Sequence, residues 1–105
     1  MEYVKITAVV RIDVMEKLDL RLQGIGVRGI SITEVKGFGE YTDNYSHDWM
    51  IGHYKLEIFT DENSSEAIVT VIMEEAHTGM PGDGFVSVQA VDQLYKIRTK
   101  SEVTD

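Results

Sequence analysis

Two glycine-rich segments and a basic run near the C-terminus are the parts of this sequence whose residue types and spacing suit ligand chemistry. The segments are residues 36–39 (Lys-Gly-Phe-Gly) and 78–84 (Thr-Gly-Met-Pro-Gly-Asp-Gly). Glycine accepts positive φ and close approach, so its backbone amides can point at the oxygens of an anion. The basic run predicts a strand in which Lys96, Arg98 and Lys100 share one face. Together these features predict a pocket for a phosphate-like anion.

The same residues also permit plainer interpretations. A basic strand face can simply be solvated, and glycines can merely shape turns. Two glycine loops flanking one basic strand favour ligand contact for Lys96 and Arg98, and they leave Lys100 as a bystander.

The polar segment after the first glycine loop invites a metal hypothesis. It contains Asp43, His47, Asp48 and His53, and such side chains suit Zn²⁺ or similar ions. No defined ligand spacing supports a site, so we predict no metal and an exposed loop. Trp49 in this loop either packs against the protein's own assembly or anchors a partner.

The composition of the chain limits the classes of protein to which it can belong. The chain has 105 residues, 43% of them hydrophobic, which suits a single globular domain over residues 1–105. It has no cysteine, which excludes disulfides and thiolate chemistry. The net charge of −8 argues against nucleic acid as a partner. No apolar run approaches the roughly 20 residues that cross a bilayer, and no signal-peptide pattern is present, so we expect a cytoplasmic protein that is not embedded in a membrane.

Hydrophobic periodicity predicts an alternation of strands and helices. Asp13 with Glu16, and Asn63 with Glu66, have the spacing of helix-capping pairs. The expected strands are 4–10, 30–36, 54–60, 85–90 and 94–98, and the expected helices are 14–24 and 63–79. The order βαββαβ with a short extra C-terminal strand is the ferredoxin-like α+β arrangement. One face of such a sheet needs cover, which self-association can supply.

The motifs at residues 29–39, 54–58, 78–84 and 97–99, in this order, resemble those of the PII signal-transduction family. The similarity extends over essentially the whole chain. The resemblance implies a homotrimer that binds adenine nucleotides in clefts between subunits. It also implies a long T-loop, here about residues 37–53, that engages a target protein.

The resemblance assigns nucleotide contacts to positions around the second strand, in the third strand, in both glycine loops and in the basic C-terminal run. These are Gly29, Ser31, Gly37, Gly39, Phe59, Gly82, Asp83, Gly84, Lys96 and Arg98. Lys96 stands where the family usually has a second arginine, so the charge is kept and the two-pronged fork is lost.

Departures from the family pattern bear on the ligand. Phe85 and His53 occupy positions where phosphate-binding lysines are usual, so we expect ADP or AMP to compete well against ATP. Glu40 and Tyr41 replace the family's Arg-Gln, whose glutamine helps to hold Mg²⁺ with 2-oxoglutarate, which argues against 2-oxoglutarate sensing.

The T-loop suggests a subgroup. It is shorter than usual, and with Trp49 downstream it resembles that of the carboxysome-associated PII-like proteins, which respond to bicarbonate together with ADP or AMP. We assign effector or partner contacts in this loop to Glu40, Tyr41, Trp49 and His53.

The expected function is therefore a non-enzymatic signal transducer with no required cofactor. A small nucleotide hydrolase and a ligand-free oligomeric scaffold are the alternatives. Catalysis needs a positioned base, nucleophile or metal, and Asp83 alone does not provide one. The sequence leaves open whether the target is a membrane transporter or a soluble protein of carbon or nitrogen metabolism.

Overall fold

The computed structural model describes residues 2–37 and 51–103, and its helices and strands follow the predicted order. The elements are β1 (Tyr3–Arg11), the 3-10 helix η1 (Ile12–Val14), α1 (Met15–Gly24), β2 (Ser31–Gly37), β3 (Ile51–Asp61), α2 (Glu62–Ala76), β4 (Phe85–Val91), β5 (Tyr95–Lys96) and β6 (Ser101–Glu102).

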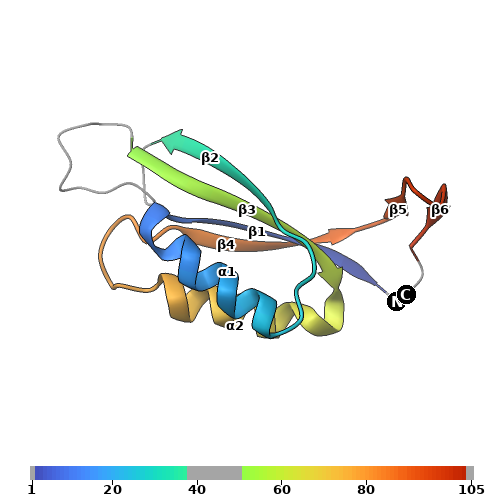
Figure 1. Cartoon of the computed structure of the whole chain (residues 1–105), viewed down its shortest axis with the longest axis horizontal. Coiled ribbons are helices and arrows are strands. Elements are labelled where there is room, and N and C mark those ends of the chain that lie inside the picture. The colour runs from blue at the N-terminus through green and yellow to red at the C-terminus, as the bar shows by residue number, and fades with distance from the viewer. Residues whose placement is uncertain (1, 38–50, 104–105) are drawn as a thin grey trace.

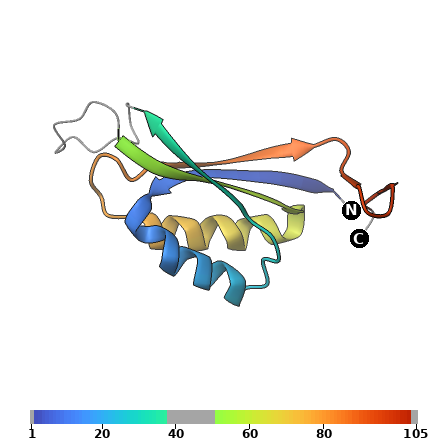
Figure 2. The same ribbon diagram turned by 45° about the horizontal axis from the view of Figure 1, so that its top comes forward.

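The four long strands form one antiparallel sheet in the order β2-β3-β1-β4. Strand β1 is central: it pairs with β3 from Tyr3↔Asp61 to Arg11↔His53 and with β4 as far as Val9↔Phe85. Both helices lie on one face of this sheet, as Figures 1 and 2 show. The predicted ferredoxin-like α+β fold is confirmed.

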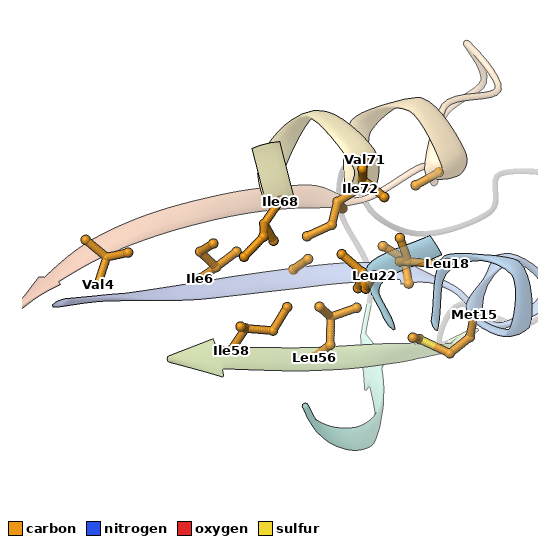
Figure 3. Packing of buried hydrophobic residues seen from close by; sticks show 13 residues of the cluster. Val4, Ile6, Met15, Leu18, Leu22, Leu56, Ile58, Ile68, Val71 and Ile72 are labelled. Atoms are coloured by element: carbon orange, nitrogen blue, oxygen red, sulfur yellow. The ribbon is translucent and has the colours of Figure 1, made fainter. Parts of the chain in front are cut away.

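Alternation along the strands produces the core between sheet and helices. Val4, Ile6, Ala8 and Val10 of β1 are buried on the helix-facing side. Figure 3 shows how side chains of β3, α1 and α2 pack against them. The most deeply buried of these are Leu18, Leu22, Leu56, Ile58 and Ile72. Burying each such side chain contributes about 1.5 to 3 kcal/mol to folding.

Both predicted helix caps are wrong. Asp13 lies inside η1, and α1 begins at Met15 without a side-chain cap because the chain passes directly from one helix type into the next. Helix α2 is capped by Asp61, whose Oδ1 accepts a hydrogen bond of 2.9 Å from the Ser64 amide. Asp61 is also the last residue of β3, so the strand end and the helix start are fixed by one residue. The second helix ends at Ala76 rather than Gly79.

The predicted C-terminal strand is also wrong beyond its first residues. Only Tyr95–Lys96 is extended, paired with Ser101–Glu102, and the four residues between them form a turn closed by a 3.2 Å bond from the Lys100 amide to the Ile97 carbonyl. Lys100 has φ of +54°. Lys96, Arg98 and Lys100 therefore do not form a single row, because an extended run needs a pairing partner along its whole length and this one has a partner for two residues only.

Candidate functional site

The connection between α2 and β4, residues 77–84, lies beside the end of β1 at one end of the sheet (Figure 1). Asp83 organises it. Its Oδ2 accepts hydrogen bonds from the amides of Thr78 at 2.8 Å and Gly79 at 2.9 Å, and its Oδ1 accepts one from the Thr78 hydroxyl. Burial by itself raises the pKa of this carboxyl, but the hydrogen bonds from Thr78, Gly79 and Arg11 outweigh burial and lower its pKa to about 2. Asp83 is thus an ionised group that closes the loop.

Two side chains from neighbouring strands hold the same loop from the sheet side. The Arg11 guanidinium at the end of β1 donates to the Pro81 carbonyl at 2.6 Å and lies 3.3 Å from Asp83 Oδ1. His53 of β3 contacts the Gly82 carbonyl through Nε2 at 3.1 Å. Because a carbonyl oxygen only accepts, Nε2 carries the hydrogen. The loop is therefore anchored at three consecutive residues, 81–83.

Sequence reasoning missed the role of Arg11 and misplaced His53. His53 was expected in an exposed loop, but it lies in β3, is 1% exposed, and pairs with Arg11 across the β1–β3 ladder. The available signal was the position of Arg11, a cation directly after the apolar run of the first strand.

Gly84 must be glycine for a reason that is independent of any ligand. Its φ is +100°, and a Cβ there would lie 1.7 Å from the carbonyl oxygen of Val9. The backbone of the loop thus packs directly on the backbone of β1, where no side chain fits.

The loop's backbone amides divide into two sets. The Thr78 and Gly79 amides donate to Asp83, and the Met80 amide donates to the Thr78 hydroxyl at 3.2 Å. The amides of Gly82, Asp83 and Gly84 donate no hydrogen bond to the described part of the chain. These three are the donors that an anion can use.

The remaining predicted nucleotide residues are spread along the molecule: Ser31 and Phe59 lie in the middle part of the sheet, and Lys96 and Arg98 lie at the end opposite the loop. Ser31 starts β2 and faces Glu57, two residues from Phe59, while Lys96 and Arg98 belong to the β5–β6 hairpin. Figure 1 places this hairpin and the loop at residues 77–84 at opposite ends of the long axis, in a molecule 48 Å long. Gly37 ends β2 on the loop side. One copy of the chain therefore does not bring Lys96 and Arg98 to the loop at residues 77–84.

Several predictions fall outside the described residues, namely those for Gly39, Glu40, Tyr41 and Trp49, and for Asp43, His47 and Asp48 as metal ligands. Within residues 2–37 and 51–103 no group of three or more histidine and carboxylate side chains is placed to hold a metal ion.

A cavity of about 210 Å³ lies on the helix side of the loop. Its walls are mainly apolar and come from the end of α2 and from β1 and β4, with Asp83 and Gly84 at one edge. This mainly apolar lining does not by itself suit a phosphate group, although the cavity shares Asp83 and Gly84 with the predicted anion site.

Comparison with known proteins decides the family. The model of the family described as "Nitrogen regulatory protein P-II" matches residues 3–101. The chain belongs to the P-II family. P-II proteins are regulatory signal transducers, and the resemblance inferred from the motifs is confirmed.

Individual P-II relatives are similar over nearly the whole chain. The nitrogen regulatory protein P-II of Pasteurella multocida is 32% identical, with 96% of each chain covered. The P-II homolog of Arabidopsis thaliana is 29% identical over 93% of this chain, which spans about half (54%) of that longer relative. A crystal structure of Arabidopsis thaliana PII bound to citrate superimposes with a TM-score of 0.81 at 29% identity, covering 96% of this chain and 85% of the other.

No helix in the described part of the chain is long and apolar enough to cross a membrane.

Proposed function

We propose that this P-II protein is a trimeric, non-enzymatic transducer that binds an adenine nucleotide between neighbouring copies. In this proposal it regulates a target protein, as yet unidentified, through the loop that follows Gly37. The observation that carries the proposal is the separation of Lys96 and Arg98 from the glycine loop at residues 82–84, which lie at opposite ends of the molecule's long axis. A second copy must supply the missing half if these residues act on one ligand.

The uncovered face of the sheet supports association. Phe59 is 53% exposed and Phe85 is 48% exposed, although both lie within long strands. Lys5, which is paired with Phe59, forms an ion pair of 3.5 Å with Glu57 across β1 and β3. Exposed aromatic side chains next to paired charges suit a face that another subunit covers.

The charge of the loop supports ADP or AMP over ATP. The Arg11 guanidinium is paired with Asp83, and the first residue after the loop is Phe85, which adds no cation. Where a loop binds an anion mainly through backbone amides, each added phosphate charge adds less affinity than it would beside cationic side chains, because few cations offset the added negative charge. Arabidopsis PII, whose solved structure is described as bound to citrate, is a relative that holds a small polyanion. Bicarbonate is our candidate for a second anion.

The state of Asp83 supports binding rather than hydrolysis. With its pKa lowered to about 2 and its oxygens occupied by Thr78, Gly79 and Arg11, this carboxylate is a poor proton acceptor near neutral pH. For a protein that binds adenine nucleotides we also propose a location in the cytoplasm.

Calorimetry with ATP, ADP and AMP, each with and without bicarbonate or 2-oxoglutarate, tests the proposal alongside the mass of the assembly in solution. We expect a trimer, saturable ADP and AMP binding, and no turnover. Arg98→Ala should weaken ADP binding by about 1.5 to 3 kcal/mol, the contribution of a charge-assisted contact. Lys100→Ala removes the same charge two residues away and should leave the affinity nearly unchanged. A monomer, or a protein that gives no heat with any nucleotide, contradicts the proposal, and product formation assigns the chain to the hydrolases instead.

A further inference from the structure

We propose that Arg11 and His53 are positioning residues that aim the backbone amides of Gly82 and Asp83 at the anionic part of the ligand. The inference rests on the proposed nucleotide binding and adds to it two residues, neither of which binds the nucleotide itself.

Two carbonyl groups of the loop face the sheet. The Pro81 carbonyl accepts from Arg11 Nη2 at 2.6 Å, and the Gly82 carbonyl accepts from His53 Nε2 at 3.1 Å. Both donors sit on the sheet at paired positions of β1 and β3, so both carbonyls point toward the sheet. The loop conformation is therefore imposed by two residues that are distant from it in sequence.

The geometry of the peptide unit fixes the direction of the amides that follow these carbonyls. In a planar trans peptide the C=O and the following N–H point in opposite directions. The described residues contain no cis peptide bond. Holding the Pro81 and Gly82 carbonyls against Arg11 and His53 therefore turns the N–H groups of Gly82 and Asp83 away from these side chains. Two adjacent amides with this orientation form a small anion-binding concavity.

The backbone amide of Gly82 belongs to a buried residue. Gly82 is buried, yet its N–H donates no hydrogen bond within the described part of the chain. Buried backbone donors are nearly always paired, because an unpaired one loses its hydration without compensation. An anion bound at the loop would supply the acceptor. The neighbouring Thr78 and Gly79 amides are excluded from this role, since Asp83 already accepts from both.

Both side chains contact the loop through polar groups. His53 is 1% exposed, and the Arg11 side chain is 19% exposed with contacts to both Pro81 and Asp83. Their effect on a ligand is thus transmitted through the peptide units that they orient.

The test measures ADP affinity by calorimetry on the full chain, with the amide signals of Gly82 and Asp83 followed by nuclear magnetic resonance. His53→Leu removes the donor and keeps an apolar side chain in the buried site. His53→Gln is the conservative variant, because its side-chain amide can still donate to the Gly82 carbonyl. Arg11→Gln is compared with Arg21→Gln, which removes the same charge from an ion pair with Glu74 and Glu75 on the helices.

We expect His53→Leu and Arg11→Gln each to weaken ADP binding by about tenfold, the effect of misaligning one or two charge-assisted hydrogen bonds. We expect the Gly82 and Asp83 amides to lose most of their ADP-induced shift in these variants. His53→Gln and Arg21→Gln should bind ADP like the parent protein. If His53→Leu does not fold, Arg11→Gln and its control carry the comparison.

The outcomes separate the two proposals. A parent protein that does not bind ADP overturns the proposed function and this inference together. A parent protein that binds ADP, with variants of equal affinity or with unchanged amide shifts, overturns the inference alone. The same holds if Arg21→Gln weakens ADP binding as much as Arg11→Gln, because the effect is then one of net charge.

Discussion

Replacing Asp83 by asparagine removes the charge that closes the loop at residues 77–84. In the folded protein its pKa falls from the ordinary 3.8 to about 2. At about 1.36 kcal/mol per pKa unit, this difference corresponds to roughly 2.4 kcal/mol of stability in favour of the ionised folded form. The side chain keeps 23% of its surface exposed, so solvent screening reduces the figure, and we expect a loss of about 1 to 2 kcal/mol for Asp83→Asn near neutral pH.

The pH dependence of unfolding gives the prediction its sign. The folded pKa lies below the unfolded one, so the contribution of Asp83 is complete above about pH 4. It is lost as the pH falls from about 4 toward 2, and over this interval the parent protein should approach the stability of Asp83→Asn.

Urea unfolding at several pH values and one fixed protein concentration measures this difference. The fixed concentration matters because the stability of an oligomer depends on it. Asp92→Asn, an equal charge change at an exposed position just after β4, is the control and should track the parent protein. If the gap between parent and Asp83→Asn stays constant from pH 7 to pH 2, the carboxylate is not the group that stabilises the loop.

The other predictions concern the backbone of the loop and the start of α2. Gly84→Ala should destabilise the protein by about 3 kcal/mol or more, because the new Cβ meets the Val9 carbonyl 1.7 Å away at a positive φ, and thermal unfolding measures it. Gly24→Ala, where a Cβ meets nothing within 4 Å, is its control, and equal losses at both sites would contradict the packing argument. Asp61→Ala should cost about 1 kcal/mol through loss of the cap on the Ser64 amide. Asn63→Ala should be nearly neutral in the same assay, and the reverse order would show that the cap is misassigned.

The conformation of the loop at residues 77–84 depends on contacts from other elements more than on the loop's own sequence. Its sequence predicts an anion-binding turn, and two of its amides instead serve an internal carboxylate. The donors left for a ligand are those at its second half, and the contacts from β1 and β3 decide their direction. A loop of the same sequence on another scaffold would lack that constraint.

Periodicity explains why the fold was predictable. Alternating apolar residues in Val4–Val10 and the helical stripe ending at Ala76 are local signals, and each element can bury its apolar face in only one way. The errors occurred where competing local signals exist. Asp61 and Asn63 both suit a cap, and the choice depends on where β3 stops pairing with β1.

The sequence by itself determined the order of strands and helices, the two glycine loops, and membership of the P-II family, because these follow from local pattern and motif. Only the tertiary structure decided three further relations. Arg11 contacts Pro81 and Asp83, which follow it by 70 and 72 positions, and the buried His53 contacts the Gly82 carbonyl. The basic hairpin lies at the far end of the molecule. The physical reason is that these relations depend on strand register and on how the sheet carries each element through space, and neither has a signature in neighbouring residues.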